Sequence, residues 1–191
     1  MRLPLLLPSD LSPDQRDLYD DMRNGIQSGF KGFEAINDDG ALIGPWNPWL
    51  HFSRFGAPTW ELVKALSASP TLPKPVREVA ILVTGAHFHS AYELYAHVLV
   101  AEASGLAEET IATIVAGQRP VDLTSQQVAA YDVASALVSG RLLPDLVYRQ
   151  AVKAFGADGA AELIYLTGLY SLVSVILNGF DVPVPESRNA L

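Results

Sequence analysis

The sequence contains no cysteine among its 191 residues. This absence excludes disulfide bonds, thiolate nucleophiles, cysteine-ligated zinc and dithiol redox chemistry. The sequence also lacks any run of five or more basic residues, and its net charge at pH 7 is -8. Nucleic acids and anionic membranes are therefore poor candidate partners, and we expect the protein to bind neither.

Alternation of apolar and polar residues, the pattern of half-buried strands, is almost missing as well. Hydrophobic residues make up 49% of the chain, which is enough for a sizeable core. We therefore predict an all-α domain of about seven to eight helices. The predicted helices occupy about residues 12–24, 58–68, 75–86, 90–104, 107–117, 124–139, 144–155 and 158–179.

Three segments bear on organisation and location. Residues 25–56 are rich in glycine, proline and aromatic residues and are predicted to be a long loop, functional or wrapped around a neighbour. Residues 161–180 are apolar but interrupted by Glu162, so we expect a buried central helix and not a membrane span. The N-terminal apolar run is broken by Pro4 and Pro8 and is too short for a signal sequence. We therefore expect a soluble, cytoplasmic protein.

The segment "HFHSAYELYAH" (87–97) concentrates histidine in one place. Ser90 and Glu93 fit a capping box, in which each side chain satisfies a backbone amide of the other at a helix start. An alternative is a metal site, because His89, Glu93 and His97 are spaced at i, i+4 and i+8 on one helical face. A helix that starts at Ser90 would leave His89 outside that face, which counts against the metal site.

A third interpretation needs only Glu93 and His97, which are i, i+4 neighbours on a helix. A carboxylate beside an imidazole fixes its tautomer and raises its pKa. A partly buried pair of this kind can transfer a proton near neutral pH. The sequence leaves open whether Glu93 caps the helix or handles protons.

The residues before this segment extend the pattern. Glu78 is followed by eleven residues, then Ser90, two residues, Glu93, three residues and His97. This spacing resembles the carboxymuconolactone decarboxylase / alkylhydroperoxidase D-like family, whose peroxidase branch has cysteines at the positions of Ser90 and Glu93. The run "YELYAH" resembles the Tyr-Glu-Trp-x-x-His run of the decarboxylase-like branch. Weaker likenesses, at residues 44–56, 105–117 and 169–185, extend the resemblance over about residues 42–185.

This resemblance implies an alkylhydroperoxidase D-like multi-helix bundle that assembles as a homo-oligomer, a trimer or hexamer. It divides the chain into an N-terminal helix and arm (1–41), the family-like domain (42–185) and a C-terminal tail (186–191). The thiol peroxidase cycle of the peroxidase branch cannot run in this chain, because a serine cannot be oxidised to a sulfenic acid.

The resemblance also implies a cofactor-free lyase, of the decarboxylase or isomerase type, acting on a small cyclic carboxylate or lactone. His97 is the candidate proton donor or oxyanion partner, Glu93 orients it, and Glu78 is a second acid–base candidate. We expect no metal and no cofactor. Candidate residues for substrate binding or for the pocket wall are His51, His89, Ser90, Tyr92, Tyr95, Trp46 and Trp49.

Two other functions stay open from the sequence. One is a metal-dependent enzyme that uses His89, Glu93 and His97. The other is a non-catalytic oligomeric binding protein that shares the fold.

Overall fold

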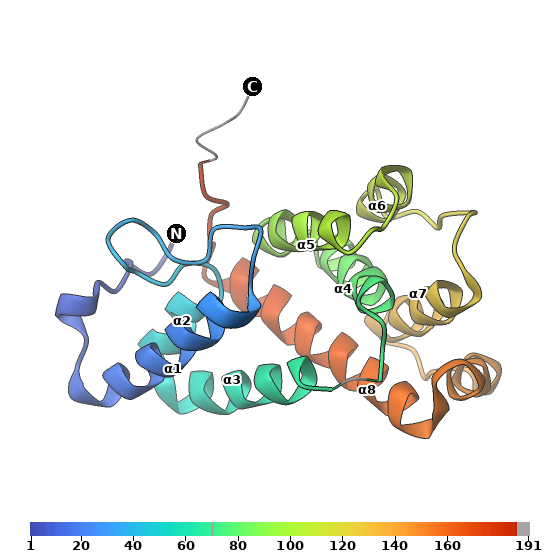
Figure 1. Cartoon of the computed structure of the whole chain (residues 1–191), viewed down its shortest axis with the longest axis horizontal. Coiled ribbons are helices and arrows are strands. Elements are labelled where there is room, and N and C mark those ends of the chain that lie inside the picture. Colours follow the sequence, from blue (N-terminus) through green and yellow to red (C-terminus); the bar gives the residue numbers. More distant parts are fainter. Residues whose placement is uncertain (70, 187–191) are drawn as a thin grey trace.

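The computed structural model describes residues 1–69 and 71–186, which fold almost entirely into helices (Figure 1). The elements are a short 3₁₀ helix η1 (Pro8–Asp10) and the α-helices α1 (Pro13–Gly29), α2 (Trp46–His51), α3 (Ser53–Ser67), α4 (Lys74–Phe88), α5 (Ala91–Ala103), α6 (Glu108–Val115), α7 (Ser125–Val138) and α8 (Asp145–Gly179). Over the described ranges, the one β pairing is an isolated bridge between Ile36 and Leu42. The predicted all-α fold is confirmed. Residues 187–191 of the predicted tail lie outside the described residues.

Helices α4 and α8 form the centre of the molecule. Figure 1 shows α8 crossing the molecule, with α1 to α3 on one side and α4 to α7 on the other. Helix α4 contacts α5, α6, α7 and α8. It is buried along most of its length, including Val79, Ala80 and Leu82, which have no exposed surface. A helix that is apolar and buried around its circumference is typical of a domain core.

Helix α8 contains a break at Gly156, whose backbone has a left-handed φ of 74°. The sequence predicted two helices separated at this position, so the break is confirmed. The helix is long and apolar enough to cross a membrane by length and composition. Half of its most apolar window is buried inside the bundle, as is usual for the core helix of a soluble protein.

The prediction of one long loop over residues 25–56 is wrong at both ends. Helix α1 continues to Gly29, and α2 and α3 occupy the second part, so the non-helical segment covers only residues 30–45. Gly25 does not end α1. A side-chain carbon there would collide with the indole of Trp60, so close packing accounts for this glycine.

The N-terminal segment is tied to the rest of the chain by hydrogen bonds. The Nδ2 of Asn47 donates to the Pro4 carbonyl at 3.1 Å, and its Oδ1 accepts from the Leu6 amide at 3.1 Å. The Arg2 amide donates to the Phe180 carbonyl at 2.9 Å. The predicted N-terminal arm therefore lies across α2 and the end of α8.

Candidate active site

A tight turn between α4 and α5 sets up the site. The Ser90 amide donates to the Gly85 carbonyl at 3.0 Å, and the His89 amide donates to the Ala86 carbonyl at 3.2 Å. These two bonds, with the left-handed backbone of His89 (φ 50°), form a Schellman-type helix end. From the end of α8, Asn178 Nδ2 donates to the Phe88 carbonyl at 2.7 Å. The turn folds α5 back against α4.

This arrangement places two glutamates on either side of one histidine. The Nδ1 of His97 lies 2.8 Å from Oε2 of Glu78 on α4, and its Nε2 lies 3.4 Å from Oε1 of Glu93 on α5. All three side chains are almost completely enclosed. The ring of Tyr170 on α8 packs edge-to-face against the imidazole, with 4.9 Å between ring centroids. The imidazole is therefore fixed on three sides.

Glu93 does not take part in the predicted capping box, and that prediction is wrong. The Ser90 side chain makes no cap hydrogen bond to α5. Glu93 instead turns its carboxyl toward His97, and its Oε1 has no hydrogen-bond partner among the described residues. The Ser90 hydroxyl is buried and also lacks a partner there. Glu93 is thus a buried acid that the protein leaves partly unsatisfied.

The pKa values of this cluster follow from burial and mutual charge. Burial raises the pKa of the Glu93 carboxyl from 4.5 to about 7; His97 opposes this rise and Glu78 adds to it. Burial also works against a charged His97. The charge and hydrogen bond of Glu78, together with the charge of Glu93, nevertheless raise the pKa of His97 above its ordinary value of 6.5. The cluster therefore gains or loses a proton near neutral pH.

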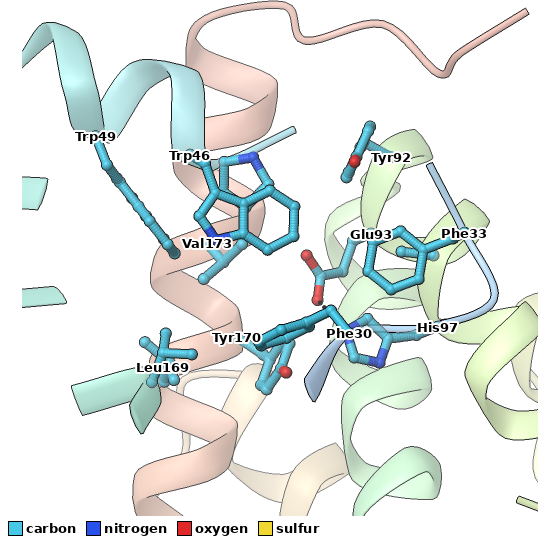
Figure 2. Close-up of a pocket in the computed structure, with 13 residues that line it drawn as sticks. Phe30, Phe33, Trp46, Trp49, Tyr92, Glu93, His97, Leu169, Tyr170 and Val173 are labelled. Carbon is cyan, nitrogen blue, oxygen red and sulfur yellow. Dashed lines mark ion pairs between the residues drawn. The ribbon is translucent and has the colours of Figure 1, made fainter. Parts of the chain in front are cut away.

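A pocket opens beside Glu93 and His97. Figure 2 shows the Glu93 carboxyl pointing into a space bounded by rings from several elements. The lining residues are Phe30, Phe33, Pro45, Trp46, Trp49, Val63, Tyr92, Glu93, Ala96, His97, Leu169, Tyr170 and Val173. Apart from Glu93, His97 and the two tyrosines, these residues are uncharged and mostly aromatic or aliphatic. The pocket is a largely apolar space with one acid–base pair in its wall.

Two further properties restrict what this pocket can hold. Among the described residues, no lysine or arginine lines it. Its cavity volume is about 40 Å³, far below the roughly 300–1,000 Å³ that is usual for a small-molecule pocket. An organic ring can enter only if part of the aromatic wall moves.

The structure brings together some of the predicted site residues and not others. Tyr92 lines the pocket with its ring, while its hydroxyl donates to the Glu34 carbonyl at 2.8 Å. His51 lies outside the lining, with Nε2 2.8 Å from the Pro4 carbonyl oxygen. His89 is exposed, and Ser90 is buried outside the pocket lining.

The proposed metal face of His89, Glu93 and His97 does not form, because His89 lies in the turn before α5. Within the parts of the chain that the structure describes, no group of three or more histidine and acidic side chains is arranged to hold a metal ion.

The sequence missed several residues that shape the site. Tyr170 is the most important, because it packs against the imidazole from a helix that is 73 residues away along the chain. A tyrosine hydroxyl within an otherwise apolar helix was the one sequence feature that could have indicated Tyr170 as a site residue. Phe30 and Phe33 come from the non-helical segment, where no periodic pattern indicates which side chains point inward. Trp46 and Trp49, which the sequence suggested as wall residues, do line the pocket.

Comparisons with known proteins identify the fold. No family model matches the sequence, and no curated protein matches it either. Solved structures do match. One is an alkylhydroperoxidase AhpD core, an uncharacterized peroxidase-related protein from Ralstonia eutropha, with a TM-score of 0.75 and 16% identity over 97% of this chain and 92% of that one.

Two other solved structures agree. The debrominase Bmp8, in a cysteine-to-alanine variant bound to 2,3,4-tribromopyrrole, has a TM-score of 0.70 and 13% identity over 97% of this chain and 92% of its own. An AhpD-type protein of unknown function from Agrobacterium tumefaciens has a TM-score of 0.65 and 15% identity over 74% of this chain and 97% of its own. The chain therefore has the AhpD-like helical fold, which confirms the predicted fold class.

Proposed function

We propose that the protein is a cofactor-free acid–base enzyme of the lyase or isomerase type, which moves a proton to or from a carbon atom of a small cyclic substrate. The observation that carries this proposal is the buried Glu93 carboxyl, whose Oε1 makes no hydrogen bond within the described residues and lies 3.4 Å from Nε2 of His97 at the edge of a pocket. A buried acid with a pKa near neutrality can act as either acid or base at physiological pH.

The three ionisable groups take distinct roles in this proposal. Glu78 accepts the Nδ1 hydrogen of His97 and so directs Nε2 toward Glu93. One proton is then shared between Nε2 of His97 and the carboxyl of Glu93. We assign Glu78 the orienting role that the sequence had suggested for Glu93. Glu93 becomes the group that meets the substrate.

An unsaturated lactone illustrates the chemistry. The Glu93 carboxylate removes a hydrogen from the carbon next to the carbonyl, and the electron pair of that bond moves into the carbonyl to give a dienolate. The Glu93–His97 pair then returns the proton at the far end of the dienolate, so the substrate is isomerised with no atom lost. In a decarboxylation, the bond that breaks to release CO2 supplies the electron pair. The Glu93–His97 pair then only delivers the proton.

The structural neighbours support the kind of substrate but not the reaction. One neighbour was solved in complex with a five-membered aromatic ring, 2,3,4-tribromopyrrole, so a protein of this fold can bind a small ring. Another is described as peroxidase-related, but a thiol-based cycle is excluded in this chain because it has no cysteine. Entry of a ring here requires part of the aromatic wall to move, since the cavity has a volume of only about 40 Å³.

Two assays test the proposal on the full-length protein. The first measures CO2 release from γ-carboxymuconolactone, and the second follows by ultraviolet absorbance the isomerisation of α-angelica lactone to its conjugated isomer. Each compares the native protein with His97→Gln, and with His87→Gln as a matched change at an exposed histidine outside the pocket. We expect turnover of at least one substrate, with a loss of about 10² to 10⁴-fold in His97→Gln and none in His87→Gln.

The isomerisation rate should fall as the pH drops through about 7, because Glu93 must be ionised to act as a base. Equal turnover in both variants would exclude the Glu93–His97 pair. Turnover of neither substrate by the native protein would contradict the lyase or isomerase assignment and favour a binding role.

We also propose that the protein works as a homo-oligomer. Tyr165, Leu172 and Val175 are exposed apolar residues spaced along α8, and burial against a second copy would remove them from water. Light scattering after size exclusion gives the number of copies. A monomer at micromolar concentration would contradict the predicted trimer or hexamer.

A further inference from the structure

We propose that the pocket selects uncharged rings that carry a hydrogen-bond acceptor, and that the indole N–H groups of Trp46 and Trp49 receive that acceptor. This inference rests on the proposed function and narrows its substrate class from a cyclic carboxylate or lactone to the neutral lactone or a similar carbonyl compound.

The first observation is that two donors are left unused. The indole nitrogens of Trp46 and Trp49 are buried and have no hydrogen-bond partner in the described residues. Each of these side chains is only 4% exposed, and both line the pocket. Buried tryptophan N–H groups usually find an acceptor, and leaving one unpaired costs about 1–3 kcal/mol.

Trp60 provides the contrast within the same molecule. Its indole nitrogen donates to Oδ2 of Asp21 at 3.0 Å, and its side chain is 1% exposed. The fold can therefore satisfy a buried indole where that indole has only a structural role. The two unsatisfied indoles both lie at the pocket.

The second observation is that these donors are held in place. Trp46 and Trp49 are three residues apart on α2, and their rings meet edge-to-face with centroids 6.4 Å apart. Gly56 packs directly against the Trp49 backbone, where any side chain would collide with it. Asn47 ties the same short helix to the N-terminal segment through two hydrogen bonds. Donors fixed before a ligand arrives bind it with little loss of conformational entropy.

The third observation is the charge of the pocket. The described lining includes no lysine or arginine, and its one candidate cation is His97. The imidazole already lies between Glu78 and Glu93. A substrate carboxylate would therefore find no cation free to pair with it in this described lining, and a buried charge without a partner is strongly unfavourable. Uncharged rings avoid this penalty.

The two sides of the pocket then complement each other. Figure 2 shows Trp46 and Trp49 on the α2 side of the space, with Glu93 and His97 on the α5 side. A carbonyl oxygen received by the indoles becomes more electron-withdrawing, and this acidifies the neighbouring carbon hydrogens. The negative charge that develops on that oxygen during proton removal is stabilised by the same two donors. Glu93 is the base on the opposite side.

The test records the indole N–H signals of the ¹⁵N-labelled full-length protein during titration with four small rings. The rings are 2-pyrone, 2-pyrone-5-carboxylate, the methyl ester of that acid, and benzene. The three tryptophans give separate indole signals, assigned with single Trp→Phe variants. We expect 2-pyrone and the ester to shift the Trp46 and Trp49 signals, while that of Trp60, already bonded to Asp21, stays in place.

Comparing the four ligands separates the effect of ligand charge on affinity from the effect of the hydrogen-bond acceptor. The carboxylate should bind about tenfold or more weakly than its methyl ester, although the ester is larger. Trp46→Phe and Trp49→Phe keep an aromatic wall and remove one donor each. Each should weaken 2-pyrone binding about three- to tenfold and leave benzene binding unchanged.

Three outcomes would overturn the inference: binding of 2-pyrone without a shift of either pocket indole signal, equal binding of carboxylate and ester, or no binding of any ring. These outcomes are distinct from failure of the proposed function. Indole shifts without turnover in the lactone assays would leave a binding pocket of this selectivity and remove the catalytic role. Turnover that depends on His97, without indole shifts, would remove only the role of the tryptophans.

Discussion

Two neighbouring residues of α4 enter two different buried charge clusters. Arg77 forms an ion pair with Oε1 of Glu162 on α8, and the other carboxyl oxygen of Glu162 accepts from the Ser69 hydroxyl at 2.6 Å. Glu78, the next residue, bonds to His97 in the pocket. The first cluster combines one cation with one carboxylate, and both carboxylate oxygens have partners.

The pocket cluster has the opposite balance. Two carboxyls, Glu78 and Glu93, share one imidazole, and Oε1 of Glu93 has no hydrogen bond in the described part of the chain. A buried polar network that is fully satisfied makes a structure rigid, whereas one that is partly satisfied lowers stability. Ionisable groups in such costly surroundings are concentrated at functional sites. The comparison agrees with a structural role for the Glu162 cluster and with the catalytic role that we propose for the Glu93 cluster.

The largest effect on stability is expected where the satisfied cluster is broken. Glu162→Ala removes the partner of a mostly buried arginine and should lower the free energy of unfolding by about 3–5 kcal/mol. Urea unfolding followed by far-ultraviolet circular dichroism measures this change. A loss below about 1 kcal/mol would show that Arg77 finds water or another partner, and the contrast between the clusters would fail.

A substitution at Glu93 in the pocket should have a smaller effect on stability, and of opposite sign. The pKa of Glu93 is raised from 4.5 in the unfolded chain to about 7 in the fold. Folding therefore favours the protonated carboxyl. The stability from this group is complete below pH 4.5, falls as the pH rises toward 7, and stays low above it. Glu93→Gln mimics the neutral form and should raise the free energy of unfolding by about 3 kcal/mol at pH 8.

This gain should shrink below pH 7 and vanish near pH 4.5, while activity is lost at every pH. Glu162→Gln is the matched control, because the same substitution at the paired carboxyl should lower stability instead. Urea titrations at a series of pH values distinguish the two. Equal effects of the two substitutions would remove the distinction between a structural and a reactive carboxyl.

The fold was largely predictable from local sequence signals. A helix was predicted over about residues 124–139, and α7 begins there with a capping box between Thr124 and Gln127, both of whose hydrogen bonds are present. The break in α8 at Gly156 was predicted as well. The extension of α1 through Gly25 was not, because that glycine is required by contact with Trp60, which is distant in sequence.

The site was predictable in part. Spacing brought out Glu78, Glu93 and His97, which the structure places side by side. The role of Ser90 was mistaken because a capping box and an acid–base pair use the same sequence pattern. Only the position of His97 on α5 shows which partner Glu93 takes. Tyr170 could not be found from spacing, since its contact with the imidazole depends on how α8 crosses α5.

Two buried or partly buried serines extend the comparison between the Glu162 cluster and the pocket cluster to single hydrogen bonds. The Ser69 hydroxyl donates to the Glu162 carboxylate, so Ser69→Ala should lower the free energy of unfolding by about 1–3 kcal/mol. The Ser90 hydroxyl is fully buried beside the α4–α5 turn and has no partner in the described chain. Ser90→Ala removes an unsatisfied group and should leave stability unchanged or raise it slightly. Thermal unfolding of the two variants at pH 7 measures the difference. If Ser90→Ala proved as destabilising as Ser69→Ala, the Ser90 hydroxyl would have a bonding partner, such as an ordered water, and the region behind the pocket would be as fully satisfied as the Glu162 cluster.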